Sequence, residues 1–168
     1  IYLNRFRMLE AAKRRGFERD RAAVNAFVKE HESWIHEYAL FMALKRHFGM
    51  KSWTEWEDED IRCRRSEAVI ERYRAELHED VELFTYIQFL FFRQWSALKS
   101  YINGLGIRII GDLPIYVSLD SADVWAEREQ FLLDRDGKPG KVAGVPPDYF
   151  SEDGQLWGNP LYDWAAMK

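Results

Sequence analysis

The sequence predicts a helix-rich α/β fold, and three features of its 168 residues carry this prediction. Up to residue 104, apolar residues recur every three or four positions, which is the spacing of amphipathic helices. Residues 107–117, IRIIGDLPIYV, then form a nearly continuous apolar run, as expected for a parallel strand covered on both faces. Helix, glycine turn and buried strand, in this order, are half of an α/β repeat.

The first helices are delimited by glycines and by residues that favour helix ends. Residues 1–15 are predicted to form a helix ended by Gly16, and residues 20–29 a second helix that begins at its aspartate. Large apolar residues recur at helical spacing over residues 34–48, and Gly49 is expected to end that helix. The N-terminal part is therefore expected to be a set of packed helices.

Further helices follow. Ser52 and Glu55 in KSWTEW match a capping box, and Ser66 is expected to begin the helix SEAVIERYRAELHE. Residues 80–103, DVELFTYIQFLFFRQWSALKSYIN, carry two adjacent apolar stripes, which predicts a long and mostly buried helix.

The last third changes character. Asp120 or Ser121 is expected to cap a short helix, and FLLDRDGKPGKV is expected to turn as a hairpin. Residues 144–160, GVPPDYFSEDGQLWGNP, show neither helical nor alternating apolar spacing. The aromatic residues of this stretch therefore lack a helix or strand that would bury them: Tyr149, Phe150 and Trp157.

Composition excludes several classes of protein. Hydrophobic residues make up 47% and the formal net charge is -4, so neither a disordered chain nor a nucleic-acid or anionic-membrane partner is expected. No apolar run is long enough to span a bilayer. The single cysteine, Cys63, fits a reducing cytoplasm. Because the chain opens within a helical pattern and without Met, we expect it to be a piece of a longer protein.

Asp112 is the first candidate site residue. It lies at the carboxyl end of the predicted strand, where the loops of α/β folds converge on ligands. The alternative interpretation is that Asp112 caps the turn that follows.

The aromatic stretch is the second candidate. Its Gly and Pro residues fix an irregular backbone, and aromatic rings among amides and carboxylates suit the apolar face and hydroxyl rim of a sugar. An Ω-loop packed on its own aromatic rings is the alternative. The polar residues in question are Asp148, Ser151, Glu152, Asp153, Gln155 and Asn159.

No metal or cofactor site is expected. The four histidines lie in the helical part without the spacing of metal ligands, and no phosphate-binding glycine motif or nucleophile elbow is present: His31, His36, His47 and His78.

Two long motifs resemble the amylomaltases, which are 4-α-glucanotransferases or disproportionating enzymes. They are GIRIIGDLPIYVSLDSADVWA and VAGVPPDYFSEDGQLWGNPLYDW, and YALFMALKRHFG, KSWTEW and FRQWSALKSYINGLG also look like that family. The resemblance implies a fragment of a (β/α)₈ barrel, with residues 107–117 as an early strand. Residues 1–79 would be a helical insertion, and residues 80–168 a barrel segment that carries the substrate-binding loop.

The resemblance also implies functional roles. Asp112 would line the sugar cleft, and the loop would contact an α-1,4-glucan through its tip and its base, without metal or nucleotide. The implied substrate-binding residues are Asp112, Tyr149, Phe150, Gln155, Trp157 and Asn159.

Members of this family transfer glucan by a retaining mechanism that needs a nucleophile and an acid/base. The resemblance places both beyond Lys168, so this chain alone is expected to be inactive and to self-associate through uncovered apolar surface. The alternative function is a non-catalytic helical module that binds an α-glucan or a protein.

Overall fold

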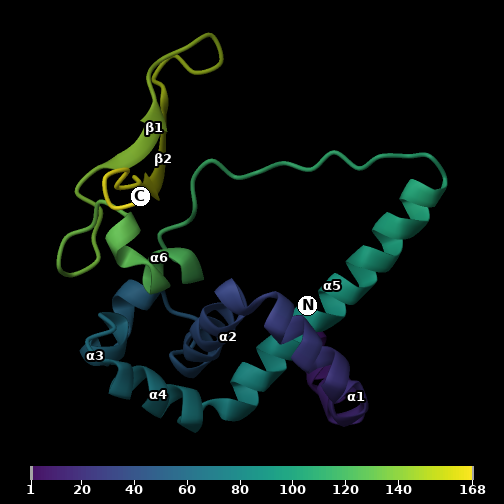
Figure 1. The fold of residues 1–168 in the computed structure, drawn as a ribbon. Helices are drawn as coiled ribbons and strands as arrows, with labels where there is room; N and C mark the ends of the chain where they lie inside the picture. Colours follow the sequence, from purple (N-terminus) through teal and green to yellow (C-terminus); the bar gives the residue numbers. More distant parts are fainter. Residues whose placement is uncertain (1, 168) are drawn as a thin grey trace. The chain divides into compact units, whose positions relative to one another are not determined.

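The computed structural model describes residues 2–167, which form two compact units (Figure 1). The first unit comprises the residues up to Leu44 together with Tyr73–Asp112. The second comprises Lys45–Arg72 and the residues from Leu113 onward. The units interleave along the chain, whereas the predicted boundary lies between residues 79 and 80. The roles assigned to those two segments stay a prediction.

The first unit is helical. It contains α1 (Tyr2–Glu30), most of α2 (Glu32–His47) and α5 (His78–Gly104). Two buried clusters form where α1 and α2 pack on the first half of α5, as helical apolar spacing predicts. The buried members are Val24, Phe27, Ile35, Tyr86 and Phe89 in one cluster and Ala39, Ala43 and Phe84 in the other.

One continuous helix, α1, replaces the two helices predicted before residue 30. Gly16 is not a C-cap but lies within the helix, where a Cβ atom would come 2.3 Å from the hydroxyl oxygen of Tyr86. Asp20 does not begin a helix either, because it lies within α1, and its carboxylate accepts a hydrogen bond of 2.9 Å from that same hydroxyl. Both residues serve the contact between α1 and α5.

The helix predicted at residues 80–103 is confirmed as α5, but it is only half buried. Its buried residues are Leu83, Phe84, Tyr86 and Phe89. Farther along, several large apolar side chains are exposed, so the expectation of a mostly buried helix is wrong for the second half. These are Phe91, Trp95, Leu98 and Tyr101.

The second unit has a core of tryptophans. It contains η1 (Trp53–Glu55), α3 (Glu59–Arg62), α6 (Ala122–Ala126) and η2 (Arg128–Gln130), while α4 (Glu67–Glu76) begins here and ends in the first unit. The rings of Trp56 and Trp125 meet edge to face at 5.8 Å. The indole of Trp125 donates to the carbonyl of Ile61 at 3.2 Å. Burial of such large side chains is a strong stabilising contribution.

Helix starts in the second unit agree with the sequence in part. Ser66 precedes α4 and Ser121 caps α6, accepting a hydrogen bond from the Val124 amide at 3.3 Å. The capping box at Ser52 is wrong, because its side chain makes no cap bond and the turn after it is a single 3₁₀ turn. Asp120, the other predicted cap of α6, forms an ion pair with the buried Lys45 at 2.5 Å.

An antiparallel hairpin makes up the only sheet in residues 2–167. Strand β1 (Val142–Val145) pairs with β2 (Gln155–Pro160), with Val145 opposite Gln155 and an irregularity between Val142 and Gly144. The second part of the aromatic stretch is therefore a strand, contrary to prediction. The turn expected in FLLDRDGKPGKV is confirmed by a bridge between Leu133 and Pro139.

Residues 107–117 form no strand in this structure, which contradicts the predicted element. Figure 1 shows the segment as a coil after α5, and Ile110 is almost fully exposed. The physical reason is that a strand is stabilised by hydrogen bonds to neighbouring strands, and residues 2–167 provide none for this segment.

No helix in residues 2–167 is long and apolar enough to cross a membrane.

Candidate functional site

The hairpin β1–β2 presents a short loop whose backbone is fixed by its own polar groups. The carboxylate of Asp148 accepts hydrogen bonds of 2.9 Å from the amides of Phe150 and Ser151. The hydroxyl of Ser151 donates to the carbonyl of Gly154 at 2.7 Å. Gly154 has a φ of +73°, and a Cβ atom there would lie 2.5 Å from the carbonyl oxygen of Val145. The loop closes without using an aromatic side chain.

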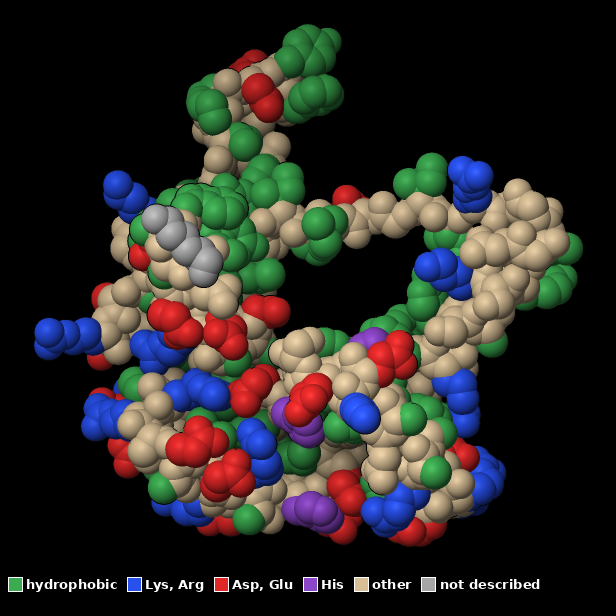
Figure 2. All heavy atoms as spheres, in the orientation of Figure 1, with side chains coloured by type: hydrophobic (Ala, Val, Ile, Leu, Met, Phe, Trp, Pro, Cys, Tyr) green, Lys and Arg blue, Asp and Glu red, His purple; other side chains and the backbone are tan. Residues whose placement is uncertain are grey.

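The two aromatic side chains at the tip of this loop point into solvent. Tyr149 is 97% exposed and Phe150 is 89% exposed, and their rings meet edge to face at 5.5 Å. Figure 2 shows hydrophobic side chains gathered at the tip of the hairpin, beside acidic ones. Large apolar groups held in water by an ordered backbone are typical of a binding surface.

The strand β2, which follows the loop, holds two more of the predicted site residues together. The indole of Trp157 donates to the side-chain oxygen of Gln155 at 3.0 Å. Trp157 remains 46% exposed, and its ring meets that of Tyr116 edge to face at 6.2 Å. The indole is thereby oriented from two sides.

Asn159 is engaged with the protein itself. Its amide nitrogen donates to the carbonyl of Val117 at 2.8 Å, and Tyr162, three residues later, donates through its hydroxyl to the carbonyl of Ile115 at 3.0 Å. The ring of Tyr162 stacks on Tyr116 at 6.0 Å. Tyr116 and Tyr162 were not among the predicted site residues, although both are part of the two motifs that carry the resemblance.

Asp112 is exposed and is the last residue of the first unit, whereas the five hairpin residues belong to the second. The structure thus brings together Tyr149 with Phe150 and Gln155 with Trp157. The role of Asp112 as a cleft residue stays a prediction, as do the sugar-binding roles of the hairpin residues.

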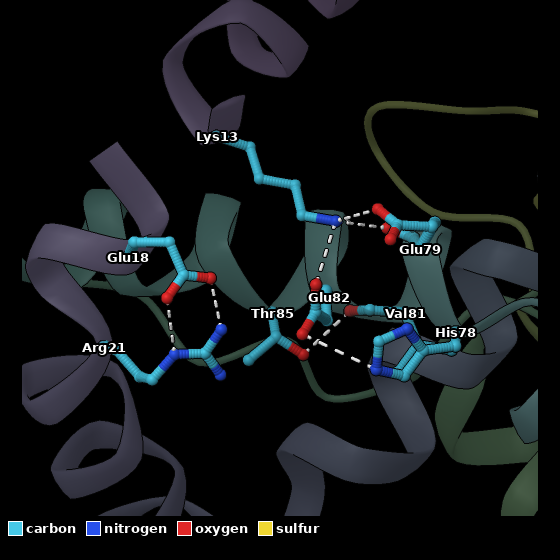
Figure 3. A network of polar contacts seen from close by, with 8 residues as sticks. All are labelled: Lys13, Glu18, Arg21, His78, Glu79, Val81, Glu82 and Thr85. Atoms are coloured by element: carbon cyan, nitrogen blue, oxygen red, sulfur yellow. Dashed lines mark hydrogen bonds and ion pairs between the residues drawn. The ribbon is translucent and has the colours of Figure 1, made fainter. Parts of the chain in front are cut away.

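A histidine and two glutamates lie close together on α5. Ligand atoms of His78, Glu79 and Glu82 lie within 4.8 Å of one another. Lys13 binds both carboxylates, at 2.7 Å for Glu79 and 3.1 Å for Glu82 (Figure 3). This hydrogen bond from Lys13 lowers the pKa of Glu79 below its ordinary value. Because the ammonium group already compensates the carboxylates, we interpret the cluster as an ion-pair network that joins α1 to α5.

Comparisons with known proteins give one consistent result. Residues 1–168 match the family model described as 4-alpha-glucanotransferase. A 4-alpha-glucanotransferase of Clostridium butyricum is 44% identical over 169 residues, which cover 100% of this chain and 34% of that protein. A rice relative named 4-alpha-glucanotransferase, chloroplastic/amyloplastic, is 50% identical over 135 residues, covering 80% of this chain and 22% of that protein.

A solved structure agrees with these relatives. An amylomaltase from Streptococcus agalactiae, determined in complex with acarbose, matches with a TM-score of 0.83 and 49% identity. The match covers 89% of this chain and 30% of that one. The chain thus spans about a third of the length of its relatives. With the family model matched over residues 1–168 and relatives of such identity, the chain belongs to the 4-alpha-glucanotransferase family.

Proposed function

We propose that this chain is part of an enzyme that transfers α-1,4-glucan segments to glucose or to another maltooligosaccharide by a retaining mechanism. The family match supports the reaction class. The exposed ring pair at the hairpin tip is the observation that carries the proposal for this part of the enzyme. The ring pair holds the glucan chain, while the nucleophile and the acid/base lie outside residues 1–168.

The rings at the tip are better explained by a ligand than by the loop's own packing. In an Ω-loop packed on its own aromatic residues, the rings would be buried under the loop. Here the hydrogen bonds of Asp148 and Ser151 close the loop, and the rings of Tyr149 and Phe150 contact each other and stay exposed. A pyranose offers apolar C–H faces for such rings, and its burial would remove their apolar surface from water.

Polar groups at the base of the loop, in β2, complement the rings. Gln155 is exposed, and its oxygen accepts the Trp157 indole hydrogen, which leaves the amide hydrogens as donors for sugar hydroxyls. A half-exposed indole beside an oriented amide provides one apolar face and one polar edge. This combination suits an α-glucan and supplies no charge for an ionic substrate.

The larger architecture is also a proposal. We propose that residues 107–117 become an early strand of a (β/α)₈ barrel when neighbouring strands outside this chain pair with them. Their β-branched composition and their lack of ladder partners in residues 2–167 support it. Residues 1–79 would then be the helical insertion and residues 80–168 the barrel segment.

A cytoplasmic location is proposed from the single cysteine, Cys63, and fractionation of the source cells tests it.

The proposed function is tested with the full-length enzyme and maltotriose, by a coupled assay that measures released glucose. We expect release by the full-length enzyme and none by the 168-residue chain. Asp112→Asn should lower turnover at least about tenfold and leave the melting temperature nearly unchanged, because the side chain is exposed.

Three results would contradict this proposal. Release of glucose by the 168-residue chain would show that the catalytic groups lie within it. Binding of maltooligosaccharides by the full-length protein without transfer would instead identify a binding module. Normal turnover of Asp112→Asn with a large loss of melting temperature would make Asp112 a structural cap.

A further inference from the structure

In the second unit, side chains bind the backbone of residues 115–119 where a neighbouring strand would bind it in a sheet. Every second carbonyl group from residue 115 to residue 119 accepts a hydrogen bond from a side chain, at 3.0, 2.8 and 2.6 Å along the segment. A spacing of two is that of the carbonyl groups along one edge of a strand. The pairs, which we name the carbonyl clamp, are Tyr162 with Ile115, Asn159 with Val117, and Trp53 with Leu119.

Ring contacts fix the same segment between two of these bonds. The ring of Tyr116 stacks on Tyr162 with an interplanar angle of 13°, and it also meets the ring of Trp157 edge to face. At the far end of the segment, Asp120 pairs with Lys45, which is only 8% exposed. Two residues of β2 and one that follows it thus hold the segment: Trp157, Asn159 and Tyr162.

We propose that Asn159 and Tyr162 are positioning residues, which hold Tyr116 against Trp157 and thereby orient the Trp157 indole for a glucan. Asn159 is then not a sugar ligand, which revises the role that the family resemblance implies for it. The inference about sugar affinity rests on the proposed function. The clamp itself rests only on the contacts within the second unit.

Hydrogen-bond chemistry favours this assignment. The Asn159 side chain is partly buried, and its amide points at the carbonyl of Val117. A sugar hydroxyl that competed for this amide would leave a backbone carbonyl without its partner, which is unfavourable. The hydroxyl of Tyr162 is engaged in the same way, so one amide hydrogen of Asn159 and the hydroxyl hydrogen of Tyr162 are used within the protein.

The test uses Asn159→Asp and Tyr162→Phe in the full-length enzyme. The first replaces the donor by an oxygen that faces the Val117 carbonyl, and the second keeps the stacked ring. Matched controls make the same changes at exposed positions outside the clamp, Asn25→Asp and Tyr101→Phe. Hydrogen–deuterium exchange without sugar should be about fivefold faster at residues 115–120 in both clamp variants and unchanged in the controls.

Affinity for maltoheptaose, measured by titration calorimetry, gives the second readout. Each clamp variant should weaken binding about threefold to tenfold, and this loss should vanish in a Trp157→Ala background, because the clamp acts through that indole. A change that affected only folding would speed exchange without this coupling to Trp157.

Each contrary result has a distinct meaning. Unchanged exchange, with a binding loss that persists without Trp157, would make Asn159 a sugar ligand and overturn the proposal. Faster exchange with unchanged affinity would also overturn it, because the clamp would then position nothing for the sugar. If the unmodified enzyme neither binds nor transfers glucans, the proposed function fails and the positioning role with it, while the exchange rates still decide whether the clamp exists.

Discussion

The hydroxyl oxygen of Tyr86 occupies the space that a side chain on Gly16 would need, 2.3 Å from the place of its Cβ atom. We therefore expect Gly16→Ala to destabilise the protein by about 1–3 kcal/mol, since a well-packed contact tolerates little added volume. This is opposite to the helix preference, which favours Ala over Gly by about 1 kcal/mol. Urea denaturation of the two proteins measures the difference.

A second variant isolates the cause of that destabilisation. In a Tyr86→Phe background the clashing oxygen is absent, and the nearest ring atom lies 3.5 Å from the added Cβ atom. There Gly16→Ala should be neutral or stabilising, by up to about 1 kcal/mol. The same destabilisation in both backgrounds would show that another contact excludes the methyl group.

The pH dependence of stability follows from Asp20. Hydrogen bonds from Arg19 and from the Tyr86 hydroxyl hold the pKa of Asp20 well below its ordinary value of about 4. The stabilisation is therefore fully present above about pH 4 and is lost as the pH falls toward the lower pKa of the folded state. Thermal unfolding between pH 2 and 7 should show this loss, and Asp20→Asn should show a smaller one. An identical pH profile for Asp20→Asn would assign the dependence to other carboxylates.

The exposed aromatic rings of the hairpin should affect long substrates more than short ones. Tyr149→Ala and Trp157→Ala should each weaken binding of maltoheptaose by about 1 kcal/mol or somewhat more, and weaken maltotriose less, because in the proposed function each ring would contact its own sugar residue. Calorimetric titration of the full-length enzyme with both sugars measures this. Tyr149→Ala should leave the melting temperature almost unchanged, given its exposure. Equal losses for both sugars would indicate that the rings serve the hairpin's own structure.

The 168-residue chain by itself should self-associate. The second half of α5 exposes Phe91, Trp95, Leu98 and Tyr101, which recur at helical spacing, and an exposed apolar patch of this kind favours association. Light scattering should give a mass above 20.0 kDa that rises with concentration. Trp95→Glu with Leu98→Lys should lower it, whereas Ser100→Glu, also on α5 and exposed, should not. A monomer at all concentrations would contradict this expectation.

The sequence predicts those elements whose causes are local. Apolar spacing locates α2 and α5, and Ser121 marks the start of α6, because these signals lie within the helix itself or next to it. Gly16 misleads for the opposite reason. Its neighbour Tyr86 lies 70 positions later, so the sequence around Gly16 contains only the general preference of glycine for helix ends.

In the candidate site, too, local features were predictable from the sequence and contacts between distant residues were not. The lack of any apolar period around Tyr149 and Phe150 correctly predicts their exposure. The hydrogen bond from Asn159 to Val117 joins residues 42 positions apart, so the sequence around either residue does not predict it. The run at residues 107–117 has the composition of a strand, but pairing depends on segments elsewhere, so composition alone does not produce a ladder.

The exposed loop at the hairpin tip also offers a site for limited proteolysis. Chymotrypsin cleaves after aromatic residues, and two adjacent ones stand in solvent at Tyr149 and Phe150. A glucan lying on these rings would shield the peptide bonds that follow them. The rate of nicking at the loop, with and without maltooligosaccharide, would therefore report occupancy of this surface without any label and without catalytic turnover.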